Sequence, residues 1–237
     1  LKVSSVVLTQ RDLEKVTKHS LGTINRTVKE LSNLGYMENG SITNAGINAL
    51  ESYRVKRAVF IAAGFGSRLV PITFNTPKPL VRVRGQRIID GLIDACLATG
   101  ISEIYIVRGY LAEQFDQLLY KYPMIKFLEN PIYNEANNIS SAMVARYLLS
   151  NAYVFEADLL ISNPKIIKPY HYTSNFLGIK KDCTDDWCVT VKDGIITEEK
   201  VGGNGPDCWQ MVGISYWNEV DGHKLSQDIK DVYEAPG

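Results

Sequence analysis

Two glycines and two cations lie close together near residue 65, and their types suit the binding of a polyphosphate. An apolar run of strand length, Ala58 to Ala62, leads directly into Ala63-Gly64-Phe65-Gly66-Ser67-Arg68. Glycines let the backbone approach a phosphate group and point its amides at it, and arginine adds a rigid cationic fork. Lys78 follows ten residues after Arg68, between two prolines. This spacing predicts a phosphate loop with two flanking cations, and it fits neither a Walker-type loop nor a dinucleotide fingerprint.

A second chemical signal is a carboxylate at the end of another apolar run. Tyr153, Val154 and Phe155 precede Glu156-Ala157-Asp158. A carboxylate at such a strand end is the usual oxygen ligand that a protein offers to Mg²⁺ beside substrate phosphates, so Asp158 is the predicted metal ligand. Glu156 is the weaker candidate for that role. The alternative is that Asp158 caps the turn that begins at Ser162.

Alternating apolar patterns predict how these residues are positioned. From Arg57 onward the periodicity switches repeatedly between extended and helical, which predicts parallel strands joined by crossover helices. The predicted helices are 87–99, 111–119 and 138–149, and the predicted strands are 58–62, 103–107, 125–128 and 152–155. We therefore expect an α/β fold over residues 55–237, with a doubly wound, mostly parallel, Rossmann-like sheet. Ligands bind outside the carboxyl ends of such strands, so the phosphate loop and Asp158 should lie together.

The stretch AAGFGSRLVPITFNTPKPLV, from Ala62 to Val81, resembles the signature of the nucleoside-diphosphate-sugar pyrophosphorylase-like nucleotidyltransferase superfamily. The resemblance implies that Arg68 holds the outgoing pyrophosphate and that Lys78 neutralises the phosphates at the reaction centre. It also implies a nucleotide site that includes Ala62, Ala63, Gly64, Phe65, Gly66 and Ser67. The alternative is a strand-to-helix turn that is merely rich in glycine.

Three further stretches, 107–115, 133–141 and 181–187, are similar to those of bacterial choline-phosphate cytidylyltransferases. By this resemblance, nucleotide contacts are expected at Tyr110, Asn137, Asn138 and Ser141, the last three at the cytosine base. An amide side chain can pair with both the carbonyl and the amine of cytosine. A helix start capped by Asn137 is compatible with that role.

The same resemblance places Trp187 and Asp185 in a choline pocket. A quaternary ammonium donates no hydrogen bond and is recognised by aromatic faces and carboxylates, which Trp187 and its neighbouring aspartates supply. Tyr172, Trp209 and Tyr216 are further aromatic candidates for this pocket, and the alternative for each is a place in the hydrophobic core. The predicted reaction is the magnesium-dependent transfer of CMP from CTP to phosphocholine, which gives CDP-choline and pyrophosphate. The alternatives are a sugar 1-phosphate or aminoethylphosphonate as acceptor, or a transcriptional regulator that senses CTP or phosphocholine.

Residues 1–54 carry a different pattern, which resembles a winged helix-turn-helix module. Thr9 caps a short helix, and Ser20 caps a second helix whose apolar stripe ends at Gly35. Asn39-Gly40 predicts a hairpin turn, and residues 43–53 return to helix. Residues 1–57 hold nine Lys+Arg against five Asp+Glu, about +4.

Two functions fit this module. In one, Thr23, Asn25, Arg26 and Lys29 face a DNA major groove. In the other, the module mediates contacts between proteins, for example in a homodimer.

The ends of the chain lead to two further expectations. No apolar run reaches the ~18 residues of a membrane span, and residues 1–5 lack the apolar stretch of a signal peptide, so we expect a cytoplasmic protein without membrane contact. The superfamily resemblance also implies a second metal-binding aspartate late in the chain. No aspartate in a matching context precedes Gly237, which predicts a transferase domain that lacks its carboxyl-terminal end.

Overall fold

The computed structural model describes residues 9–135, 138–205 and 208–235 of the 237-residue chain. The chain divides into two compact units, Leu1–Arg54 and Val55–Gly237, which are described separately below.

The first unit consists of helices and a short hairpin. Its elements are α1 (Gln10–Thr17), α2 (Leu21–Asn33), β1 (Met37–Glu38), β2 (Ser41–Ile42), α3 (Asn44–Leu50) and the 3₁₀ helix η1 (Glu51–Tyr53). The predicted caps are confirmed, because Thr9 and Asp12 form a capping box and the Ser20 side chain accepts from the Thr23 amide. Asn39 and Gly40 both have positive φ, as a tight hairpin turn requires. The order of elements is the predicted one, while the assignment as a winged helix stays a prediction.

The second unit is built around an eight-stranded sheet. Neighbouring strands of this sheet are hydrogen-bonded in the order β11-β10-β12-β8-β3-β6-β7. The strand β9 also pairs with β12. The parallel part comprises β3 (Arg57–Ile61), β6 (Glu103–Arg108), β7 (Lys126–Glu129) and β8 (Ala152–Glu156). This part confirms the predicted α/β fold with a mostly parallel central sheet and flanking helices.

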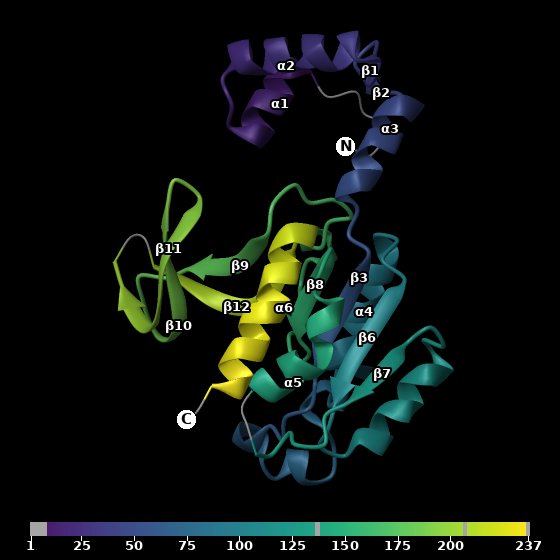
Figure 1. Ribbon diagram of the computed structural model, residues 1–237, viewed down its shortest axis with the longest axis vertical. Coiled ribbons are helices and arrows are strands. Elements are labelled where there is room, and N and C mark those ends of the chain that lie inside the picture. The colour runs from purple at the N-terminus through teal and green to yellow at the C-terminus, as the bar shows by residue number, and fades with distance from the viewer. Residues whose placement is uncertain (1–8, 136–137, 206–207, 236–237) are drawn as a thin grey trace. The chain divides into compact units, whose positions relative to one another are not determined.

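Helices cover both faces of this sheet (Figure 1). On one face α4 (Ile88–Ala98) packs over a core that includes the stacked rings of Phe60 and Phe155. On the other face lie α5 (Asn138–Ala145) and α6 (Glu219–Glu234). Among the described helices, none is long and apolar enough to cross a membrane.

One predicted helix differs from the structure. The segment expected as a helix over 111–119 is a 3₁₀ helix, η5 (Ala112–Tyr120). Leu111, which precedes it, has a φ of 47° and provides no side-chain cap, so the segment lacks the extended, capped entry that a regular α-helix favours.

The antiparallel part of the sheet was not predicted. It consists of β9 (Asn175–Lys180), β10 (Cys183–Lys192), β11 (Ile195–Asn204) and β12 (Cys208–Trp217). β12 pairs with β8, β9 and β10, and its register against β9 shifts between Met211 and Ser215. The shorter elements are η2 (Ser67–Leu69), η3 (Ile72–Phe74), η4 (Lys78–Leu80), β4 (Arg82–Val83), β5 (Gln86–Arg87), η6 (Arg146–Leu148) and η7 (Pro164–Ile166).

Candidate active site

The phosphate loop follows β3 and folds back on itself through Gly66. This glycine has a φ of 69°, and a Cβ atom there would lie 3.2 Å from both the Lys78 Cβ and the Thr73 Cγ2. The hydroxyl of Thr73 donates to the Gly66 carbonyl at 3.1 Å. Within the described residues, the amides from Gly64 to Ser67 donate to no backbone carbonyl. The loop therefore presents consecutive amides of the kind that bind anions.

Tyr110 ties the two ends of this loop together. Its amide donates to the Ala63 carbonyl at 3.0 Å, and its hydroxyl donates to the Phe74 carbonyl at 3.0 Å. Its ring meets the Phe65 ring edge-on, with 4.7 Å between centroids. Tyr110 was predicted as a nucleotide contact, and the structure adds a positioning role that holds the loop in shape.

Lys78 and Asp158 meet although they are 80 residues apart in the sequence. The Lys78 ammonium donates to Asp158 Oδ2, and both side chains are 26% exposed. The Ala157 amide donates to the Ile61 carbonyl, so Asp158 lies just beyond the carboxyl ends of β3 and β8. The structure thus brings the phosphate loop and Asp158 to one edge of the sheet, where the sequence placed them.

The donor set suits a magnesium ion that substrate oxygens complete. Among the described residues, no three His, Cys, Asp or Glu side chains are grouped to hold a metal ion by themselves. Mg²⁺ commonly takes only one or two carboxylates together with substrate phosphates and water. Asp158 fits that arrangement, because its carboxylate stands beside the phosphate loop.

Charged side chains from separate segments act on one another at this edge. Partial desolvation raises the pKa of Glu156, and the negative charges of Asp158 and Asp186 raise it further. The positive charges of Lys78 and Arg68 oppose these effects. Arg68 and Asp186 therefore belong to the same electrostatic site as the Lys78–Asp158 pair.

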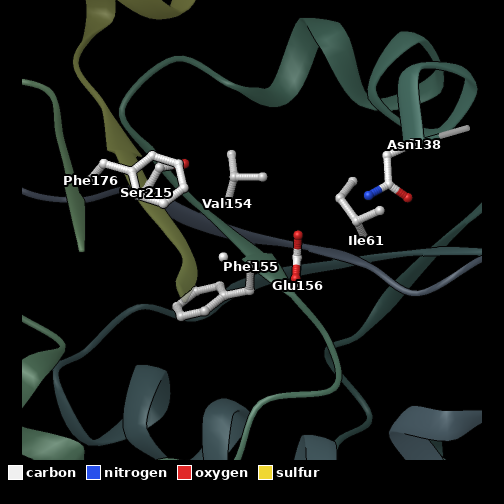
Figure 2. Close-up of a pocket in the computed structure, with 8 residues that line it drawn as sticks. Ile61, Asn138, Val154, Phe155, Glu156, Phe176 and Ser215 are labelled. Atoms are coloured by element: carbon white, nitrogen blue, oxygen red, sulfur yellow. The ribbon is translucent and has the colours of Figure 1, made fainter. Parts of the chain in front are cut away.

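A cavity of about 160 Å³ opens beside Glu156 (Figure 2). It is larger than the ~10–15 Å³ that a single water needs and smaller than the ~300–1,000 Å³ of a pocket for a drug-sized ligand. It lies among β3, β8, β9, β12 and the start of α5, and its walls are mainly apolar. It is lined by Ile61, Asn138, Val154, Phe155, Glu156, Phe176, Gly213 and Ser215.

The start of α5 holds the residues predicted as cytosine contacts. Asn138 is exposed and lines the cavity. Ser141 is buried, and its hydroxyl and that of Ser140 each accept a 3.0 Å hydrogen bond from the buried Asn130 amide. Ser141 therefore supports the loop before α5, whatever else it contacts. Asn137 lies outside the described residues.

Trp187 and its aspartate neighbours lie on β10. Trp187 is 53% exposed, and Asp185 is exposed beside it. Asp186 is held in place, because its carboxylate accepts from the Trp187 amide at 2.8 Å and from the Gln210 amide group at 3.3 Å. None of these side chains lines the cavity.

Of the further aromatic candidates, Tyr216 lies in the core, as the alternative interpretation expects. Its ring is buried and stacks on His171, with 4.6 Å between centroids, so it belongs to the core. Tyr172 is 78% exposed.

Two residues of the candidate site were not predicted from the sequence. Gln210 orients Asp186, and Gly213 lies against the Glu156 carboxylate, where a Cβ atom would come within 2.7 Å. Both come from β12, a strand that the sequence pattern did not reveal. A glycine inside an apolar run was the only local signal.

Comparisons with known proteins agree with this geometry. The family pattern described as "Nucleotidyl transferase" matches residues 57–173. The chain is 39% identical over 184 residues to the 2-aminoethylphosphonate cytidylyltransferase of Lancefieldella rimae, which covers 76% of this chain and 74% of the relative. It is 32% identical over 184 residues to the choline-phosphate cytidylyltransferase of Streptococcus pneumoniae, with 76% and 77% covered.

A solved structure agrees as well. The CTP:phosphocholine cytidylyltransferase from Streptococcus pneumoniae superposes with a TM-score of 0.70 at 32% identity, and the match covers 76% of this chain and 78% of that one.

Proposed function

Because the chain belongs to the nucleotidyl transferase family, and to its cytidylyltransferase type, we propose that it transfers CMP from CTP to a small zwitterionic acceptor. The acceptor carries a phosphonate or phosphate group and a cationic head group. 2-Aminoethylphosphonate is the first candidate, and phosphocholine, the acceptor expected from the sequence, is the second. The observation that carries the proposal is the contact between Lys78 and Asp158 at the mouth of the phosphate loop.

The proposed reaction is a direct displacement at phosphorus. An oxygen of the acceptor's phosphonate or phosphate attacks the α-phosphorus of CTP, and the bond between that phosphorus and the bridging oxygen to the β-phosphate breaks. Because the acceptor group is already anionic at neutral pH, no base is needed to activate it. The electron pair leaves with pyrophosphate, whose charge Arg68 and Lys78 stabilise.

The phosphate loop and the metal ligand bind the triphosphate of CTP. The amides from Gly64 to Ser67 bind the triphosphate oxygens, and Tyr110 keeps those amides aligned. Asp158 would hold Mg²⁺, which supplies further neutralisation of the triphosphate charge when bound.

Two observations favour an acceptor with a primary ammonium group. The relative at 39% identity is named for 2-aminoethylphosphonate, and the relative at 32% is named for choline phosphate. The side chain of Tyr216, one of the rings expected around a quaternary ammonium, lies in the core.

The experiment is pyrophosphate release with Mg²⁺ across a matrix of substrates. CTP, UTP and dTTP are each combined with 2-aminoethylphosphonate, phosphocholine, phosphoethanolamine and glucose 1-phosphate. We expect the highest kcat/KM when CTP is paired with 2-aminoethylphosphonate. Release with glucose 1-phosphate alone, or equal use of all three nucleotides, would contradict the proposal.

For the unit Leu1–Arg54 we propose binding of duplex DNA through α2. Asn25, Arg26 and Lys29 are all exposed on this capped helix, within reach of base edges and phosphates. The test is fluorescence anisotropy of the full chain with mixed-sequence duplex DNA at several salt concentrations. Arg26→Ala together with Lys29→Ala should weaken binding and flatten its salt dependence, with Lys165→Ala in the second unit as control. Equal binding by wild type and the double variant would exclude this helix as the contact.

A further inference from the structure

We propose that Glu156 and the cavity beside it form the subsite for the acceptor's primary ammonium group, and that Glu156 thereby sets acceptor specificity. The inference rests on the proposed function, since it concerns the acceptor of the same reaction. It gives Glu156 a role other than that of a metal ligand.

The position of Glu156 follows from the sheet. It is the last residue of β8 and pairs with Ile61 at the end of β3. Side chains alternate along a strand, so Glu156 projects on the same face as Val154, the face that α5 covers. Figure 2 shows its carboxylate standing between Val154 and Ile61, in the space toward Asn138.

Gly213 makes room for this carboxylate. It has a φ of 68°, and a Cβ atom there would lie 2.7 Å from the Glu156 carboxyl carbon. The glycine occupies the stretch where β12 shifts its register against β9, just before β12 pairs with β8. The strand therefore bends around the Glu156 head group, and any larger residue at 213 would displace it.

Among the described residues, no group donates a hydrogen bond to the Glu156 carboxylate and no cation lies within ion-pair distance of it, although Lys78 and Arg68 act on it at longer range. Its surroundings are mainly the apolar side chains of Ile61, Val154 and Phe176. Glu156 is exposed, so water reaches its carboxylate, and a cationic ligand that entered the cavity would replace that water as the partner of the carboxylate.

The dimensions suit a head group rather than a nucleotide. A cavity of about 160 Å³ has room for a few heavy atoms. Glu156 and Asp158 are two residues apart, so their Cα atoms are separated by at most about 7 Å. Both side chains therefore stand within reach of one small acceptor, whose ammonium would meet Glu156 while its phosphonate reaches the Lys78–Asp158 pair. Asp186 adds negative charge from β10.

The hydrogen-bonding capacity of the site favours a primary amine. An ammonium group has three N–H donors, which an unpaired carboxylate can accept, whereas a trimethylammonium group has none. The chemical class of the ligand is therefore a short aminoalkyl phosphonate or phosphate.

The test compares 2-aminoethylphosphonate with n-propylphosphonate, in which a methyl group replaces the ammonium. Pyrophosphate release is measured with CTP for the wild type, Glu156→Gln and the control Glu113→Gln, which removes an exposed carboxylate from η5. We expect the wild type to prefer 2-aminoethylphosphonate by about 100-fold in kcat/KM. Glu156→Gln should lower that preference by about 30-fold or more, mainly through the KM for the amine, and should change the KM for CTP less than about twofold.

Gly213→Ala serves as a second variant, because it keeps the charge of Glu156 and displaces the carboxylate, although it also strains the backbone at a φ of 68°. It should raise the KM for the aminophosphonate acceptor in the same direction, while Glu113→Gln resembles the wild type. Thermal unfolding of each variant checks that the fold is intact.

The outcomes separate the inference from the proposed function. A wild type that uses both phosphonates equally, or that prefers phosphocholine, overturns the inference while the transferase activity stands. A Glu156→Gln variant that needs more Mg²⁺ with both acceptors assigns Glu156 to the metal and also overturns it. If the wild type releases no pyrophosphate with any acceptor, the proposed function itself is contradicted.

Discussion

The two sides of the active site are built in different ways. The phosphate side, Gly64 to Lys78, comes from one continuous stretch that returns on itself through Gly66 and Thr73. The side that we propose binds the acceptor, called the acceptor side, is assembled from the strands β8, β10 and β12, which contribute Glu156, Asp186, Gln210 and Gly213. Phosphate is bound by backbone amides and two cations, which a local loop can supply. A head group must be recognised by side chains that converge across strands.

This difference indicates where specificity is decided. Relatives of this chain at 39% and 32% identity share the transferase family but are named for different acceptors. Changes on the phosphate side should therefore impair the reaction with every acceptor, whereas changes on the acceptor side should separate one acceptor from another.

The largest effect is expected from Lys78→Ala on the phosphate side. Loss of the cation that faces the developing pyrophosphate charge should lower kcat about 10²–10³-fold with every acceptor. Lys121→Ala, which removes the exposed pair with Asp94 and the contact of the ammonium with the Tyr122 ring, is the matched control. Steady-state kinetics with 2-aminoethylphosphonate and phosphocholine measure both variants. A fall confined to one acceptor would break the division between the two sides.

Asp158→Asn is expected to have the next largest effect. The variant keeps the side-chain volume but removes the charge that pairs with Lys78 and that we propose to hold Mg²⁺. It should lower kcat about 10²-fold and shift the Mg²⁺ titration to higher concentration, again for every acceptor. An unchanged Mg²⁺ titration would assign Asp158 a role in orienting Lys78 alone.

On the acceptor side, Trp187→Ala sharpens the comparison. If the half-exposed indole contacts a quaternary ammonium, its loss removes up to about 2 kcal/mol, or about 3- to 30-fold in the KM for phosphocholine. The KM for the aminophosphonate, whose ammonium we place at Glu156, should change less than about threefold. The same kinetic assay, with Tyr120→Ala at an exposed position as the control, measures the ratio of the two effects. Equal losses with both acceptors would place Trp187 in a shared part of the site.

The smallest effect is expected from Tyr110→Phe. The variant removes only the hydrogen bond from the Tyr110 hydroxyl to the Phe74 carbonyl, worth about 0.5–1.5 kcal/mol, and keeps the ring against Phe65. The KM for CTP should rise about two- to tenfold without a change in acceptor preference. Titration of CTP at saturating acceptor checks this. A change in acceptor preference would show that the loop also shapes the acceptor side.

Local patterns were sufficient for much of the fold. The parallel strands β3, β6 and β8 contain near-continuous apolar runs, because both of their faces are covered, whereas β7 lies at the edge of the sheet and is only partly buried. The caps Thr9 and Ser20 are visible in the sequence because a cap acts on residues of its own first turn. The strands β10 and β11 escaped prediction, since exposed and charged residues interrupt their pattern and cross-strand pairing creates them. The strand β12 is largely apolar, but it was assigned to no element from its sequence.

What the sequence by itself determined is the phosphate side: a glycine where positive φ is required, two cations at a set spacing, and a carboxylate at a strand end. These features are local, so neighbouring residues specify them. Only the tertiary structure decided that Lys78 touches Asp158, that Tyr216 belongs to the core, and that Gly213 bends β12 around Glu156. Such contacts depend on strand order and register, which arise from packing over the whole sheet and leave no short motif.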